Sequence, residues 1–154
     1  MEKSIDQLHQ LMNNVLSDFS HINKKRIGIW VKEGDYLNSK VQINIENDEI
    51  DYELYVYLHK AKEEVLVPHE IFIFLHEMSH IVILEKLKNE QGIGYVEQYL
   101  SKYSEDIMEL EEKAKKEKWN DEKIQKEYEN IECEKQTDTL TKTLFARYVH
   151  IAST

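Results

Sequence analysis

Three titratable side chains lie inside a long apolar stretch of this chain. Residues 71–84 read IFIFLHEMSHIVIL, with His76, Glu77 and His80 set among aliphatic and aromatic residues. Charge buried in such a segment must be paired or bound to a metal. A metal ion would satisfy two imidazoles and a carboxylate together, so we expect this segment to form part of a metal site.

The spacing of these groups favours zinc. His76 and His80 are four residues apart in an H-E-x-x-H pattern. On a helix such residues share one face about 5–6 Å apart, so both imidazoles can reach one tetrahedral ion. Glu77 projects to the edge of the same site, where it can accept a proton from metal-bound water. The alternative is a pair of hydrogen-bonded core histidines without a metal.

A catalytic zinc ion needs a third protein ligand and an open fourth position. The metzincin pattern fails, because Lys86 and Ile83 stand where it needs histidine and glycine. His150, near the end of the sequence, is a second option. The third option is Glu134, followed four residues later by Asp138. The two share one helical face, so Glu134 can bind zinc while Asp138 orients an imidazole.

Other glutamates compete with Glu134 for this role. Glu127, Glu129 and Glu132 lie on the same predicted helix. We prefer Glu134 because it alone among them has an acid four residues downstream, at Asp138. The alternative is that both carboxylates belong to a solvated acidic helix face, which is the usual role of such charge.

The segments HEMSH and EKQTDTLTKTLF together resemble the gluzincin metallopeptidases, and more closely the small ImmA/IrrE-type peptidase domains. Members of that family have a short sheet, an H-E-x-x-H helix and a later helix reading roughly E-x-x-A-D-x-F-A. The resemblance implies a zinc peptidase with His76, His80 and Glu134 as ligands. It also implies Glu77 as general base and Asp138 as the residue that orients a ligand.

The chain departs from the family pattern at two points. Thr137, Leu140 and Thr141 stand where the family prefers alanine, phenylalanine and alanine. The interval between His80 and Glu134 is also longer than usual. We therefore expect a single zincin-like domain, 1–154, with a helical insertion at about 94–120.

Composition limits the class of protein. The net charge of −10 argues against a nucleic-acid partner, because binding to phosphate backbones needs clustered Lys and Arg. Cys133 is the single cysteine, so no intrachain disulfide can form, which suits a reducing compartment. The start of the sequence lacks a signal-peptide pattern, and the apolar stretch 65–84 carries residues too costly for lipid. We therefore expect a cytoplasmic protein with no membrane partner.

Hydrophobic periodicity predicts the elements that must position the site. Alternation indicates strands, the 3.6-residue period indicates helices, and Asn120 is the expected N-cap of the last helix. The predicted fold is α+β, with a small, largely antiparallel sheet of about three strands packed on a central H-E-x-x-H helix, an N-terminal helix and long C-terminal helices. The predicted elements are helices at 3–19, 68–88, 94–117 and 121–149, and strands at 26–33, 40–47 and 51–60.

These expectations combine into a zinc-dependent metallopeptidase acting on a peptide or protein substrate. An edge strand at 40–45 would bind the substrate backbone by strand addition. Tyr95, Tyr128 and Tyr148 are candidates for a donor to the oxyanion. The alternative from another class is a non-catalytic interaction protein that keeps the zincin-like scaffold and works through the charged helices at 94–149.

Overall fold

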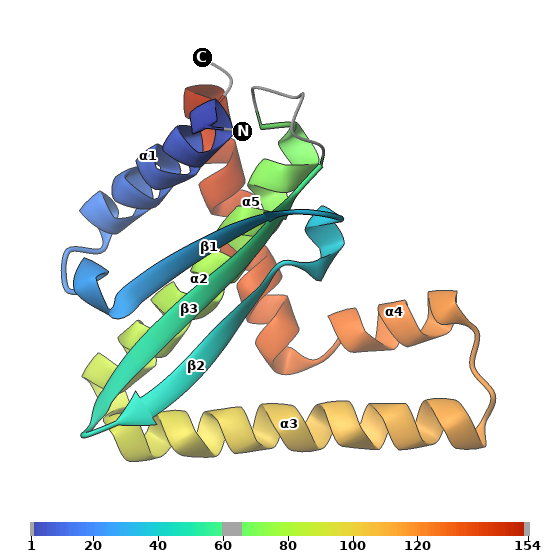
Figure 1. Ribbon diagram of the computed structural model, residues 1–154. Coiled ribbons are helices and arrows are strands. Elements are labelled where there is room, and N and C mark those ends of the chain that lie inside the picture. Colours follow the sequence, from blue (N-terminus) through green and yellow to red (C-terminus); the bar gives the residue numbers. More distant parts are fainter. Residues whose placement is uncertain (1, 60–65, 153–154) are drawn as a thin grey trace.

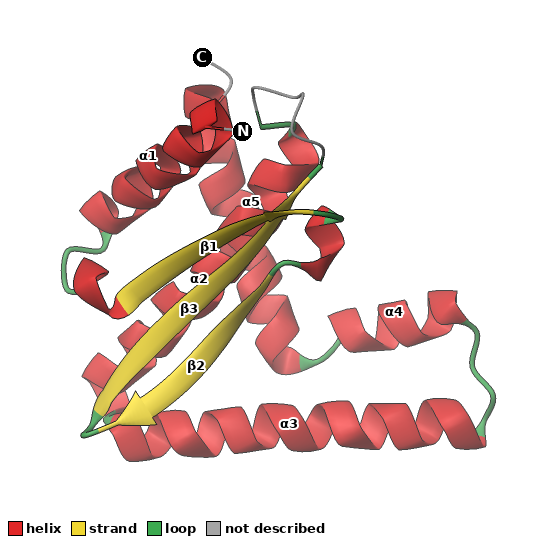
Figure 2. Cartoon of the chain, in the orientation of Figure 1, coloured by secondary structure: helices red, strands yellow, loops and turns green. Residues whose placement is uncertain are grey.

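A computed structural model describes residues 2–59 and 66–152 of the chain (Figure 1). The fold is α+β: helices surround one face of a three-stranded sheet (Figure 2). The helices are α1 (Glu2–Asp18), α2 (Pro68–Gln91), α3 (Ile93–Lys116), α4 (Asp121–Glu129) and α5 (Glu132–Ala152), the strands are β1 (Ile27–Glu33), β2 (Lys40–Glu46) and β3 (Glu49–Leu58), and the short 3-10 helices are η1 (Lys24–Arg26) and η2 (Tyr36–Asn38).

The sheet has the order β1-β3-β2, which makes β2 an edge strand. Strands β2 and β3 form the predicted hairpin, whose turn residues Asn47 and Asp48 have φ values of 52° and 63°. Positive φ at both central positions is the requirement of a type I′ turn, which matches the twist of the strands it joins. Lys60, the last residue of the predicted third strand, lies outside the described residues.

The expectation of a largely antiparallel sheet is wrong for one of its two pairings, because β1 and β3 are parallel. The sheet is therefore mixed. The inward side chains of β3 are almost fully buried, as Tyr52 and Leu54 illustrate at 1% and 0% exposure. Strand β3 is the central strand because it pairs with β1 on one side and with β2 on the other. Alternation along each strand identifies the inward face but not the order of neighbours.

Helix α2 is the central helix, as predicted. It begins at Pro68, where a missing N–H costs nothing, and the Glu70 carboxylate accepts a hydrogen bond from the Val67 N–H at 3.0 Å. Gly92 ends it with φ of 88°. Buried residues occur on all sides of the helix, because it contacts the sheet, α3 and α5. Among the helices described here, none is long and apolar enough to cross a membrane.

The predicted helix at 121–149 is two helices, α4 and α5, separated at residues 130 and 131. Ile131 turns inward and is 9% exposed, and α5 then follows a new direction along α2 (Figure 1). Neither glycine nor proline marks this break in the sequence. Asn120 is confirmed as the N-cap of α4, because its side chain accepts a hydrogen bond from the Lys123 N–H at 2.8 Å.

Candidate metal centre

Small polar side chains fill the contact between α2 and α5. Ser79, Thr137 and Thr141 are each 0% exposed, and Thr141 Oγ1 lies 3.1 Å from Ser79 Oγ. Small residues at a helix contact allow the two backbones to approach closely. The first turn of α5 therefore lies over the face of α2 that carries the two histidines, which brings Glu134 to them.

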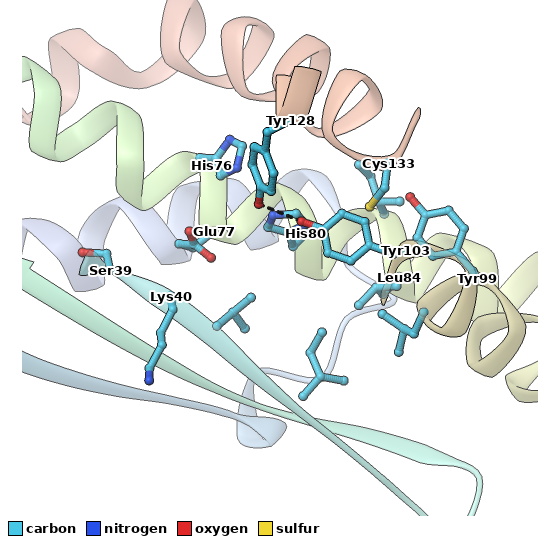
Figure 3. A pocket seen from close by; sticks show the side chains of 14 residues that line it. Ser39, Lys40, His76, Glu77, His80, Leu84, Tyr99, Tyr103, Tyr128 and Cys133 are labelled. Atoms are coloured by element: carbon cyan, nitrogen blue, oxygen red, sulfur yellow. Dashed lines mark hydrogen bonds between the residues drawn. The ribbon is translucent and has the colours of Figure 1, made fainter. Parts of the chain in front are cut away.

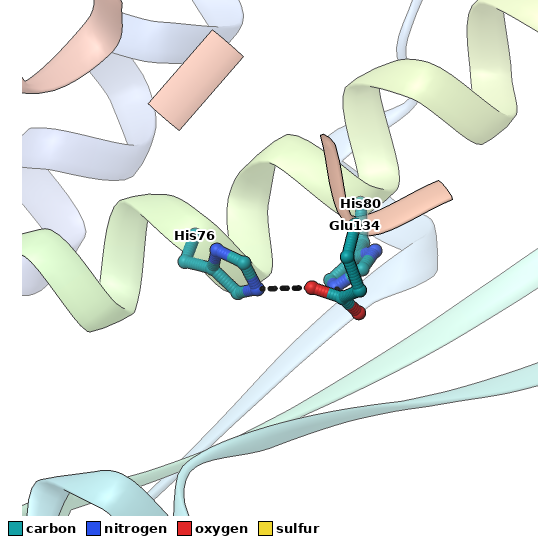
Figure 4. A group of neighbouring side chains, drawn as sticks. All are labelled: His76, His80 and Glu134. Carbon is teal, nitrogen blue, oxygen red and sulfur yellow. Dashed lines mark ion pairs between the residues drawn. The ribbon is translucent and has the colours of Figure 1, made fainter. Parts of the chain in front are cut away.

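His76, His80 and Glu134 form a compact group (Figure 4). Nε2 of His76 lies 3.4 Å from Oε2 of Glu134, and Nε2 of His80 lies 3.9 Å from Oε1 of the same carboxylate. One ligand atom from each residue falls within 4.8 Å of the other two. Glu134 is 3% exposed, so its charge needs a partner inside the fold.

The group fits a zinc ion in chemistry and in spacing. Two imidazoles and one carboxylate are a donor set of catalytic zinc sites, which leave a fourth position open. Two ligands of a tetrahedral zinc ion lie about 3.3 Å apart when each bond is about 2.0–2.1 Å. The nitrogen–oxygen distance between His76 and Glu134 is close to that value, and the one between His80 and Glu134 is about half an ångström longer.

Residues of α5 also contact the far nitrogen of each histidine. Oδ1 of Asp138 lies 3.3 Å from Nδ1 of His76. Oγ1 of Thr137 lies 3.4 Å from Nδ1 of His80, and the same hydroxyl donates to the carbonyl oxygen of Cys133 at 2.8 Å. Its lone pairs can therefore accept from the His80 ring. Both contacts favour the tautomer that leaves Nε2 free to bind a metal.

Glu77 lies beside the ligand group and lines the same cavity as both histidines (Figure 3). Burial, reinforced by the nearby charge of Glu134, raises its pKa to about 7, against the lowering effects of His76 and a backbone hydrogen bond from Val41. A carboxyl group with this pKa is matched to proton transfer near neutral pH.

The charges of the group are mutually dependent. Burial opposes ionisation of Glu134, but hydrogen bonds from His76 and Tyr103 and the charges of both histidines lower its pKa to about 2. Burial and the neighbouring charge of His76 lower the pKa of His80 to about 4. His80 is therefore neutral at physiological pH, which is the form that binds metals.

Two tyrosines from α3 and α4 contact the proposed carboxylate ligand. Tyr103 and Tyr128 both donate to Oε1 of Glu134, the latter at 3.1 Å, and their hydroxyl oxygens are 2.9 Å apart. Burial raises the pKa of Tyr128 to about 12, so this phenol is a protonated donor at neutral pH. These contacts connect the helices that precede α5 to the site.

The five residues singled out in the sequence, His76, Glu77, His80, Glu134 and Asp138, lie together in the structure. The competing glutamates at 127, 129 and 132 are outside the described ligand group. Of the three candidate tyrosines, Tyr128 lines the cavity, whereas Tyr148 donates to Asp18 of α1 and Tyr95 is 45% exposed. The side chain of His150 lies outside the described part of the structure.

Sequence reasoning missed Tyr103, Thr137 and Thr141. The two threonines follow Glu134 by three and seven residues, so they share its helical face, and that spacing was a usable signal. Tyr103 had no such signal, because its place depends on how α3 packs against the site.

A cavity of about 280 Å³ opens beside the ligand group. One side is formed by edge strand β2 through Lys40, Val41 and Ile43, and the other by α2 and α3. The cavity gives a small molecule or a peptide group access to Glu77 and to the two histidines (Figure 3).

Comparisons of the chain with protein-family models, with curated proteins and with solved structures found no significant match. Its function is therefore inferred from the residues and the geometry of this site.

Proposed function

We propose that this protein is a zinc-dependent metallopeptidase of a minimal zincin type. The observation that carries the proposal is the grouping of His76, His80 and Glu134, with Glu77 in the adjoining cavity. Two helices supply the ligands, which is the arrangement expected from the resemblance to gluzincin peptidases. An edge strand borders the cavity. A cytoplasmic location, expected from the single cysteine, belongs to the same proposal.

Each residue has a defined part in peptide hydrolysis. The zinc ion, held by His76, His80 and Glu134, would polarise the scissile carbonyl and lower the pKa of a water molecule in the open position. Glu77 accepts the proton of that water and later delivers it to the leaving amine. Asp138 and Thr137 keep the two imidazole rings in the tautomer and orientation that ligation needs.

Strand β2 is suited to hold the substrate backbone. Its edge away from β3 is unpaired with any other strand among the described residues. The backbone N–H of Val41 donates a hydrogen bond to the Glu77 carboxylate, so the unpaired edge of β2 lies beside the proposed base. Because backbone groups alternate in direction along a strand, those of Ile43 point to the same edge. An extended peptide can therefore pair with β2 and cross the site.

Tyr128 is the residue we assign to the oxyanion. Its phenol lines the cavity and stays protonated at neutral pH. The single phenol proton, which donates to Glu134 in this structure, turns to a carbonyl oxygen as that oxygen gains negative charge, while Tyr103 keeps its own hydrogen bond to Glu134. Tyr103 lies 2.9 Å from it and also bonds Glu134, so it holds the phenol of Tyr128 in place.

The variant Glu77→Gln tests this function. We expect it to bind zinc like the natural protein and to lose cleavage of a mixed peptide library by a factor of at least about 100, because the general base is gone. Glu90→Gln, an exposed glutamate on the same helix, is the matched control and should cleave normally. Cleavage is read by mass spectrometry of the products. Equal cleavage by the Glu77→Gln variant would refute the mechanism.

A specific feature favours a second candidate, the interaction protein. Helices α3 and α4 form an arm on which Met108 is 63% exposed, beside Trp119 and Ile124 in a surface pocket. An apolar patch of this kind can bind another protein. Bound zinc without cleavage of any peptide or candidate protein would favour this function over hydrolysis.

A further inference from the structure

The cavity beside the ligand group has two chemically different ends (Figure 3). His76, Glu77 and Lys40 lie at one end. Leu84, Tyr99 and Cys133 lie at the other, apolar end (Figure 3). Ile83 and Leu100, the chain neighbours of Leu84 and Tyr99, also line the cavity, as does Ile43 of β2.

The apolar end carries no charged side chain among the described lining residues. Ile43, Ile83 and Leu100 are only partly buried, so they expose apolar surface to the cavity. A charged group placed there would lose its hydration without gaining a partner, whereas an apolar group would gain by leaving water. The whole cavity, both ends together, has a volume of about 280 Å³, which accommodates a peptide group and one leucine or phenylalanine side chain.

The position of this end relative to the ligands sets what it can contact. Leu84 follows His80 by four residues on α2, which is about one helical turn or 6 Å along the axis. It lies on the side of His80 away from His76 (Figure 3). A peptide whose scissile carbonyl sits at the ligand group therefore reaches this end with a side chain next to the cleaved bond.

We propose that this end of the cavity is a specificity pocket, which selects substrates with a large apolar side chain on a residue that flanks the cleaved bond. The inference rests on the proposed function and adds to it the class of peptide that is cut. Tyr99 and Leu100 come from α3, so this helix contributes to substrate selection as well as contacting the ligand carboxylate through Tyr103.

Binding of zinc-chelating probes tests the pocket without any turnover. N-acetylated hydroxamates of leucine, phenylalanine, alanine and aspartate place their side chains beside the ion, and calorimetry with the zinc-loaded protein measures their Kd. We expect the leucine or phenylalanine probe to bind about 10- to 100-fold more tightly than the alanine probe, and the aspartate probe to bind most weakly. Equal affinities for all four would overturn the pocket.

A matched pair of variants locates the effect. Leu100→Trp narrows the apolar end, so it should remove most of the preference for large probes while the alanine probe binds unchanged. Leu110→Trp changes a partly buried leucine of the same helix outside this cavity and should keep the preference. A preference retained in Leu100→Trp would overturn the assignment.

Zinc content, measured first, separates the two levels of failure. If the protein binds zinc but binds all four hydroxamates equally, the metal site is supported and the specificity pocket is refuted. If the protein binds neither zinc nor any hydroxamate, both the proposed function and the specificity pocket are refuted.

Discussion

Oδ1 of Asp138 lies 3.3 Å from Nδ1 of His76, although the two residues belong to different helices. The contact joins the middle of α2 to the second turn of α5 and directs the opposite ring nitrogen at Glu134, 3.4 Å away. A carboxylate behind a ligand imidazole fixes its tautomer and increases its basicity. The distance therefore has a direct consequence for metal affinity.

Replacing Asp138 with asparagine should weaken zinc binding. The amide keeps the size of the side chain but removes the negative charge behind His76, and losses of about 10- to 100-fold in affinity follow such changes. Competition with a chromophoric chelator measures the Kd. Glu132→Gln, which removes an exposed charge from the same helix, should leave the Kd unchanged. An unaltered Kd in Asp138→Asn would contradict the orienting role.

Thr137→Val should weaken zinc binding by about tenfold, because the valine cannot accept from Nδ1 of His80. Thr139→Val is the matched control: its hydroxyl likewise donates to the carbonyl oxygen four residues back, at 2.9 Å, but is exposed. The same chelator competition, run beside thermal unfolding, separates lost affinity from lost stability. Equal zinc affinities in the two variants would exclude Thr137 as a positioning residue.

In the metal-free protein, Glu77 should reduce the free energy of unfolding by an amount that depends on pH. Burial raises the pKa of Glu77 from its ordinary 4.5 to about 7, so between these values the folded state holds a proton that the unfolded chain has released. This group therefore lowers stability as the pH rises through that window. In chelator at pH 8, Glu77→Gln should be more stable than the natural protein by up to about 3 kcal/mol.

The extra stability of the Glu77→Gln variant should disappear near pH 4, where the carboxyl of Glu77 is protonated in both the folded and the unfolded protein. Thermal unfolding across pH 4 to 8 gives the comparison, and Glu90→Gln, exposed on the same helix, should show no such trend. A Glu77→Gln variant no more stable than the natural protein at pH 8 would contradict the buried position of this carboxyl.

Leu144 packs in the core at 1% exposure, on the helix that carries Glu134. Leu144→Ala should reduce the free energy of unfolding by about 2–5 kcal/mol, since it removes buried methyl groups and leaves a cavity. Thr143→Ala, one residue earlier and exposed, should cost far less. Urea denaturation measures both. Similar losses in the two variants would mean that α5 does not pack through Leu144.

Local sequence patterns were sufficient to predict most of the helices and strands. The apolar residues all round 68–88 predicted a central helix, and Asn120 was predicted as an N-cap from its residue type and position. The proposed ligands could also be predicted from the sequence. His76 and His80 form one pair with helical spacing, and Glu134 and Asp138 form another. Such features depend on residues close together in the chain.

Features that depend on packing between distant segments could not be predicted from the sequence. The parallel pairing of β1 with β3 follows from the central place of β3, which alternation cannot reveal. The break before α5 is made by burial of Ile131 rather than by a helix-breaking residue. Tyr103 reaches Glu134 only because the chain turns after α2 and α3 packs against α2 and α4, and no local spacing encodes that.

Zinc stoichiometry is the most direct measurement of the central claim. Elemental analysis of the purified protein after dialysis against trace zinc should give one zinc ion per chain. Glu134→Ala should retain little or none under the same conditions while remaining folded by circular dichroism. A natural protein that holds no zinc, or a folded Glu134→Ala variant that holds as much as the natural protein, would contradict a site formed by His76, His80 and Glu134.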